Sequence, residues 1–275
     1  MPSSVIPHIY LILGAAGSGR REVVADLIEG GLGEGERAAV LLADDEAPDA
    51  CDARLPNLTR WTWADGFILA PLPAEATRVF FVTHGRANPV DQVEAFKLWL
   101  DAQGAALSTG SGPAGANPAG GGGGLARVLC VVNCRLATEQ PPLLAWFEAC
   151  VHFTDIVLLN RREGVENKAL SDFLAHFQKQ YYPCLFEPVK AGRVKNPALV
   201  LEPQARRMSH VFDEEQEWIF TDGDGEEIDE QEETDDEDGV TAAPEEDPYF
   251  VRDATGRRVL KVPDVAKFLP PVVGA

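Results

Sequence analysis

A glycine-rich turn between an apolar run and a helical pattern, within residues 10–27 (YLILGAAGSGRREVVADL), most constrains how this chain folds. The apolar run ends at Leu13, and three glycines occupy the next six positions. Val23, Val24 and Leu27 then recur at the spacing that places them on one face of a helix. Strand, glycine turn and helix in this order predict the first unit of an α/β fold with a parallel sheet.

This turn has the layout of a phosphate-binding loop, in which backbone N–H groups and a helix N-terminus hold an anion. The usual pattern is GxxxxGK[ST], with Lys for the β- and γ-phosphates and a hydroxyl for Mg²⁺. Gly14 and Gly19 hold the glycine positions, but Arg20 replaces the Lys and Arg21 replaces the hydroxyl residue. An arginine fork can contact phosphate, whereas Arg21 cannot ligate Mg²⁺. The alternative is a turn that binds no ligand. The candidate phosphate-binding residues are Gly14, Gly17, Ser18, Gly19, Arg20 and Arg21.

The rest of the first 212 residues alternates between buried-strand patterns and amphipathic helices. This alternation predicts a mostly parallel sheet with helices on both faces. The expected strands are 9–13, 38–42, 59–64, 67–70, 78–83, 127–132, 155–159 and 185–189. The expected helices are 20–29, 90–103, 141–150 and 167–182. Residues 104–124 lack hydrophobic periodicity and are rich in Gly, so we predict a flexible insertion there.

The chain's acidity is concentrated in one stretch. The formal net charge is −20 over 275 residues, yet 19 acidic residues and no Lys or Arg lie between Asp213 and Asp247. The remainder carries 25 acidic and 24 basic residues, so the globular part is nearly neutral. Because no basic patch is visible, we expect no nucleic-acid partner. We predict two domains, a nucleotide-binding domain at 1–212 and an acidic tail at 213–275.

Two segments of the predicted tail look like copies of one unit. Residues 217–228 and 248–259 each hold an Asp-x-x-Gly turn between apolar positions, which predicts two β-hairpins. Glu226 and Glu227 in the first segment match Arg257 and Arg258 in the second, so the hairpins could pair. The strongly acidic residues 229–246 between them are expected to be disordered.

Cysteine usage and the N-terminal sequence indicate a cytoplasmic protein. The chain has five cysteines, an odd number, and three of them lie in apolar surroundings that suit reduced thiols. The first residues contain no basic segment before the apolar run, so no signal peptide is predicted. No window is apolar enough for a membrane span, and we expect no membrane partner.

The order of the motifs resembles the CobW-like metal-chaperone GTPases, relatives of HypB and UreG, over roughly residues 6–202. That family carries a P-loop, a GCxCC metal motif, ExSG followed by a small residue and Pro, an NKxD guanine motif and a GxxD-type turn. The corresponding segments here are GAAGSGRR (14–21), DGFILA (65–70), VTHGRANP (82–89), NRRE (160–163) and GRVKNPALVL (192–201). The resemblance implies a P-loop NTPase-like fold and GTP as ligand, with guanine contacts from Asn160, Arg161 and Glu163.

Several positions depart from the family pattern. Gly66 is followed by Phe-Ile-Leu-Ala, so no sulfur ligand is left and we predict no Zn²⁺ site. Val82 replaces the acidic residue of ExSG, and His84 replaces its Ser. Losing this acid and the loop hydroxyl removes two groups that would hold Mg²⁺, so we predict no Mg²⁺ site either. No catalytic residue is assigned, and GTP hydrolysis is left open.

Three hypotheses follow. The first is a degraded, CobW-like pseudo-GTPase that binds guanine nucleotide weakly and acts through an unidentified protein partner. The second is an active, divergent GTPase of the metallochaperone type, in which Arg20 and Arg21 neutralise the phosphates and Asp44 or Asp45 recruits Mg²⁺. The third is an interaction module that binds no nucleotide and uses its acidic tail.

Overall fold

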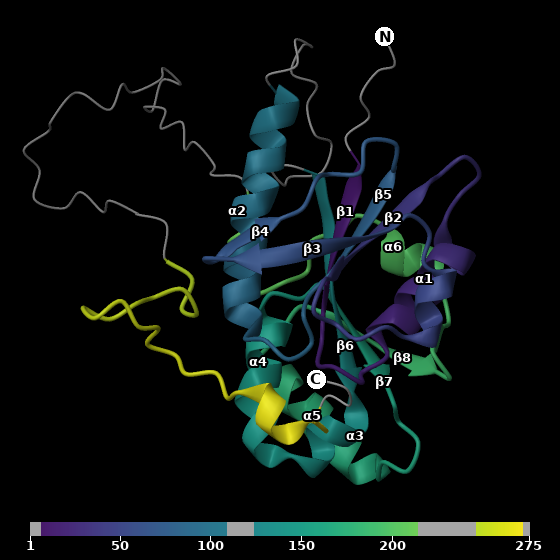
Figure 1. The fold of residues 1–275 in the computed structure, drawn as a ribbon. Helices are drawn as coiled ribbons and strands as arrows, with labels where there is room; N and C mark the ends of the chain where they lie inside the picture. The colour runs from purple at the N-terminus through teal and green to yellow at the C-terminus, as the bar shows by residue number, and fades with distance from the viewer. Residues whose placement is uncertain (1–6, 109–123, 214–245, 272–275) are drawn as a thin grey trace, which may run out of the picture.

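The alternating strands and helices form a single sheet covered on both faces (Figure 1). The structure, a computed structural model, describes residues 7–108, 124–213 and 246–271. The strand order is β4-β3-β2-β5-β1-β6-β7-β8-β9. All neighbours pair in parallel except β4 on β3 and β9 on β8, which are antiparallel. The expected α/β fold with a mostly parallel sheet and helices on both faces is confirmed.

The strands are β1 (His8–Leu13), β2 (Ala38–Ala43), β3 (Leu58–Ala64), β4 (Phe67–Leu69), β5 (Arg78–Val82), β6 (Leu125–Asn133), β7 (Ile156–Asn160), β8 (Leu185–Lys190) and β9 (Arg193–Val194). The α-helices are α1 (Arg20–Gly31), α2 (Pro89–Ser108), α3 (Cys134–Glu139), α4 (Leu144–His152), α5 (Asn167–Lys179) and α6 (Pro197–Leu201). Short 3₁₀ helices are η1 (Ala50–Arg54), η3 (Pro141–Leu143) and η4 (Val265–Phe268).

Two hydrophobic layers hold the helices on the sheet. Side chains of β1 alternate between them because successive residues of a strand point to opposite faces. Tyr10 and Ile12 join the layer beneath α1 and α6. Leu11 and Leu13 join the layer beneath α2, α3, α4 and α5. Figure 1 shows the same division, with α1 and α6 together and α2, α4 and α5 on the other side.

Three helix predictions need correction. The helix expected at 141–150 is the 3₁₀ turn η3 (Pro141–Leu143) followed by α4 (Leu144–His152). The helix expected at 167–182 ends at Lys179, and Tyr181 adopts a left-handed conformation (φ 58°). Residues 104–108 of the predicted insertion belong to α2, in agreement with the high helix propensity of their Ala-Ala-Leu sequence.

Residues 246–271 return to the core that the first part of the chain builds. Val265 is buried, and Phe250 and Phe268 pack against the layer that contains α2 and α4. The Asp-x-x-Gly turn expected in 248–259 is present, with a bridge between Arg252 and Arg258. Arg258 pairs with Asp91 and Glu94 of α2. The possible pairing of the two hairpins involves Glu226 and Glu227, which lie outside the described residues.

The other predictions for the tail, the hairpin at 217–228 and the disorder at 229–246, lie outside the described residues except for position 246. The same holds for residues 109–123 of the predicted insertion. Among the residues that the structure describes, no helix combines the length and apolar character that crossing a bilayer requires.

Candidate functional site

The turn between β1 and α1 has a backbone that only glycine accommodates at two positions. Gly14 and Gly19 have φ values of 138° and 86°. A Cβ on Gly14 would lie 2.4 Å from the Val131 carbonyl oxygen, and one on Gly19 would lie 2.4 Å from Asn160 Nδ2. Gly19 is also the N-cap of α1 and supplies no capping side chain. The N–H groups of the first helical turn therefore lack the side-chain acceptor that commonly caps a helix.

Asn160, at the end of β7, fixes the other side of this turn. Its side-chain amide donates to the Ser18 carbonyl oxygen at 2.8 Å, and the residue is 2% exposed. β7 is separated from β1 only by β6, so the carboxyl ends of these parallel strands meet at one edge of the sheet. The sequence assigned Asn160 and Ser18 to one site, and the structure places them in direct contact.

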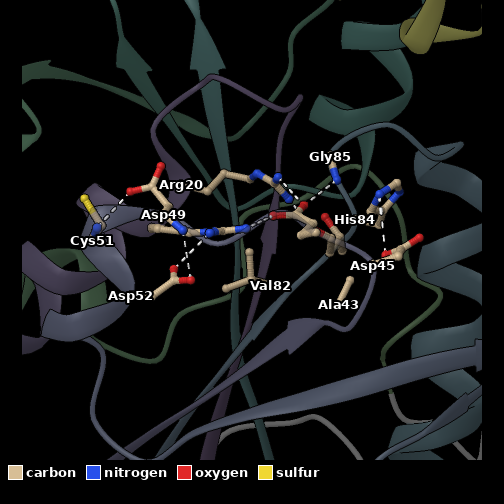
Figure 2. A network of polar contacts seen from close by, with 12 residues as sticks. Arg20, Ala43, Asp45, Asp49, Cys51, Asp52, Val82, His84 and Gly85 are labelled. Carbon is tan, nitrogen blue, oxygen red and sulfur yellow. Dashed lines mark hydrogen bonds and ion pairs between the residues drawn. The ribbon is translucent and has the colours of Figure 1, made fainter. Parts of the chain in front are cut away.

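Arg20 begins α1 and is nearly buried. Its guanidinium donates to the Thr83 carbonyl oxygen at the end of β5 and, at 2.5 Å, to Glu46 Oε1. The backbone N–H of Gly85 donates to the same Glu46 oxygen at 2.8 Å. Figure 2 shows Arg20 and Gly85 meeting at this carboxylate from two different segments. Glu46 thus accepts a side-chain and a backbone hydrogen bond through one oxygen.

Arg21 completes the network through the second carboxylate oxygen. It donates to Glu46 Oε2 at 2.7 Å and to Asp52 of η1 at 2.9 Å. Burial alone raises the pKa of Glu46, but the charge of Arg20 and the hydrogen bonds from Arg21, Arg20 and Gly85 lower it to about 2. The Glu46 carboxylate is therefore ionised at neutral pH, and it neutralises arginines that were expected to contact phosphate.

A cleft of about 400 Å³ opens beside this network, above the start of α1. Gly17, Gly19, Arg20, Arg21 and Glu46 are among the residues that line it. The remaining lining residues are Ala16, Glu22, Asp45, Ala47, Pro48, Asp49, His84, Arg86 and Arg161. The cleft is large enough for a nucleotide-sized ligand.

Only some of the other predicted site residues line the cleft. Arg161 lines it and pairs with Glu22 of α1 at 2.8 Å. Glu163 is exposed in the loop after β7 and is not among the residues that line the cleft. The Ser18 side chain is fully buried, and its hydroxyl has no hydrogen-bond partner within the described part of the chain. His84 lines the cleft, and its Nε2 lies 3.6 Å from Asp45.

Two side chains at or next to the positions expected to hold Mg²⁺ make other contacts. Arg21 occupies the position of the hydroxyl ligand and is held in ion pairs. Thr83, at the end of β5, donates its hydroxyl to the Ile12 carbonyl oxygen. Within residues 7–108, 124–213 and 246–271, no three His, Cys, Asp or Glu side chains form a group that could hold a metal ion. Charge at this site is instead balanced by arginine and carboxylate.

Sequence reasoning missed Glu46, Gly85 and Asp52 as members of the site. The signal for Glu46 was present, because Asp44, Asp45 and Glu46 follow β2 directly. Arg20 and Arg21 begin a helix that packs on the sheet. Arginines that become partly buried in this way need a counter-charge. Neither pattern predicts that the end of β2 lies close to the start of α1, because this proximity depends on the order of strands in the sheet.

Of the comparisons with known proteins, only the one with solved structures finds similar proteins. No family model matches the chain, and no curated protein matches it. Among solved structures, it is similar to the hydrogenase maturation factor HypB from Archaeoglobus fulgidus, with 13% identity and a TM-score of 0.41 over 66% of this chain and 81% of that one. It is also similar to the Zn(II)-bound YjiA GTPase from E. coli, with 14% identity and a TM-score of 0.38 over 73% of this chain and 66% of that one. A Zn(II)-bound triple mutant of YjiA gives 14% identity and a TM-score of 0.37 with the same coverage. At these identities the likeness concerns the fold alone.

Proposed function

We propose that the cleft above α1 binds a nucleoside phosphate without magnesium-assisted hydrolysis, and that the protein acts through contacts with a protein partner. The arrangement at the start of α1 carries this proposal. An uncapped helix N-terminus opens onto a cleft that two arginines line, and Asn160 fixes the glycine turn from the other side. Backbone N–H groups and a helix N-terminus favour phosphate. The sequence resemblance favours guanine as the base.

The Ser18 hydroxyl is fully buried and has no hydrogen-bond partner among the described residues. A buried hydroxyl without a partner costs free energy, and such groups are rare in folded proteins. Ser18 belongs to the turn itself, since its carbonyl oxygen accepts from Asn160 and its N–H donates to the Ala15 carbonyl oxygen. Ser18 does not line the cleft, so a ligand bound there does not account for this hydroxyl.

Slow or absent hydrolysis follows from the side chains at the ends of β2 and β5. Phosphoryl transfer depends on a metal that bridges the β- and γ-oxygens and on a group that positions the attacking water. Val82 ends β5, and Glu46, the carboxylate of the network that follows β2, is held by Arg20 and Arg21. We expect phosphate release from GTP to stay at the buffer background with and without Mg²⁺. Sustained Mg²⁺-dependent release would favour the divergent GTPase instead.

Position 17 offers a matched test of nucleotide binding. Gly17 is exposed and lines the cleft, and a Cβ there would meet no atom within 4 Å. Its φ of 80° is left-handed, which Asn and Asp tolerate better than other side chains. Gly17→Asp and Gly17→Asn therefore differ mainly in one negative charge at the cleft.

Fluorescent GDP and GTP are titrated into the wild-type protein and both variants. We expect Gly17→Asn to bind close to wild type and Gly17→Asp to bind more weakly than Gly17→Asn by on the order of tenfold or more, through charge repulsion. Equal affinities of the two variants would place the nucleotide elsewhere. Absence of binding to all three proteins would refute the proposal and favour the interaction module.

A further inference from the structure

Glu46 receives the same kinds of donors that a bound phosphate receives. Arg20 donates from its guanidinium, Gly85 donates from its backbone N–H, and Arg21 donates to the other carboxylate oxygen. Backbone N–H groups and arginine forks are the usual donors to phosphate oxygens. The Glu46 carboxylate is therefore an anion bound by the kinds of donor that usually bind phosphate.

The place of this carboxylate along the cleft is set by the strand order. Asn160 and Arg161 follow β7, on one side of β1, while Gly85 and Glu46 follow β5 and β2 on the other side. A nucleotide whose base lies toward Asn160 and whose first phosphates lie over the start of α1 would direct its last phosphate toward Glu46. The residue at the loop position that reaches the β- and γ-phosphates, Arg20, is the one bound to Glu46.

We infer that the Glu46 carboxylate occupies the subsite of the terminal phosphate, so that the cleft selects a nucleoside diphosphate over the triphosphate. This inference rests on the proposed nucleotide site. A γ-phosphate entering this end of the cleft meets a like charge at close range and finds Arg20 and Arg21 already paired. A diphosphate ends before this subsite and leaves the ion pairs intact.

The packing around Glu46 makes its displacement costly. Its side chain is 9% exposed, and Arg20 and Arg21 are 5% and 11% exposed. Gly85 is held in place because its carbonyl oxygen accepts from the Ala16 N–H at 2.7 Å. A Cβ on Gly85 would lie 2.3 Å from Arg20 Nη2, so the segment passes directly against the arginine. Withdrawing the carboxylate would leave buried guanidinium groups without their partner.

The test compares fluorescent GDP and GTP binding to the full-length wild type, Glu46→Gln and a control variant, Glu36→Gln. Glutamine keeps the shape of Glu46 and removes its charge. Glu36 also pairs with an arginine, Arg78, but it precedes β2, whereas Glu46 follows β2 at the opposite edge of the sheet. The control therefore removes a paired carboxylate away from the cleft.

We expect wild type and Glu36→Gln to prefer GDP over GTP by on the order of tenfold or more, and Glu46→Gln to lose this preference through tighter GTP binding. Equal binding of GDP and GTP to wild type would overturn the inference while the proposed function stands. This wild-type comparison needs no variant, so it remains decisive if Glu46→Gln fails to fold.

A second measurement separates the inference from the proposed function. Inorganic pyrophosphate is added to wild type and Glu46→Gln, and the thermal midpoint of unfolding is recorded. We expect pyrophosphate to raise the midpoint of Glu46→Gln by more than that of wild type, because Arg20 and Arg21 then lack the negative charge of Glu46. If neither protein binds nucleotide but this difference appears, the anion subsite stands and the nucleotide proposal fails. Equal midpoint changes in both proteins would overturn the role of Glu46.

Discussion

The Asn160 side-chain amide donates to the Ser18 carbonyl oxygen at 2.8 Å and so joins the end of β7 to the glycine turn after β1. The two residues are 142 positions apart in the sequence. This contact holds the turn in the conformation that exposes the first N–H groups of α1 to the cleft.

Replacing Asn160 should loosen the glycine turn. Asn160→Ala leaves the Ser18 carbonyl oxygen without its buried donor, and we expect a loss of about 1–3 kcal/mol in the free energy of unfolding. Asn160→Asp keeps the shape but has no donor, and we expect it to be no more stable than Asn160→Ala. Urea denaturation measures both. An Asp variant as stable as wild type would show that the contact contributes little.

Acid should remove the stability that the Glu46 network provides. The pKa of Glu46 in the folded protein, about 2, lies below its ordinary value of 4.5. A lowered carboxyl pKa stabilises the folded state above the ordinary value, and this contribution falls as the pH drops from about 4.5 toward 2. The contribution is about 3 kcal/mol at neutral pH.

Glu46→Gln isolates this effect. The difference in unfolding free energy between wild type and Glu46→Gln, measured by denaturation at a series of pH values, should stay constant above pH 5 and shrink below it. A difference that does not depend on pH would contradict the lowered pKa.

The contact between His152 and Asp247 should hold residues 246–271 on the core. His152 Nε2 lies 2.8 Å from the Asp247 carboxylate, and Ser209 donates to the same carboxylate oxygen at 2.5 Å. Burial alone raises the pKa of Asp247, but the hydrogen bonds from His152 and Ser209 lower it overall. Asp247→Asn should speed amide hydrogen exchange near Phe250, measured by mass spectrometry. Asp264→Asn, in the same segment but half exposed, is the control and should change it less.

Thiol chemistry should distinguish Cys51 from the other four cysteines. Burial raises the pKa of Cys134 and of Cys184 to about 12, and Cys130 and Cys150 are fully buried. Only Cys51 is partly exposed. We expect iodoacetamide at pH 8 to add one group per native chain and five in denaturant, as read by intact mass. Rapid addition of more than one group to the native protein would contradict the burial of these thiols.

Much of the sheet could be predicted because its strands are continuous apolar runs. The predicted bounds of β1, β2 and β5 differ from the observed ones by one residue at most. The helix α3 was missed because Cys134–Glu139 is too short for a periodic pattern. The helix α6 was missed because residues 192–201 were interpreted as a family motif, although Asn196 and Pro197 form a helix start.

The site could be predicted only as far as local sequence defines it. The glycine turn and Asn160 each belong to a short sequence motif. For this reason the sequence alone could assign both to one site. The pairing of Arg20 and Arg21 with Glu46 depends on packing between the end of β2 and the start of α1. A charge count cannot show this pairing, because the globular part contains almost equal numbers of acidic and basic residues.

The hydrogen bond between Ser209 and Asp247 joins two points of the chain that are 38 positions apart. Ser209 and Asp247, which lie before and after the acidic residues 214–245, are thus joined at one place on the core. One peptide-bond cleavage inside this stretch would yield two fragments that still share a hydrophobic core. A protein cut there would therefore keep its C-terminal piece, because Val265 is buried and Phe250 and Phe268 pack against the core.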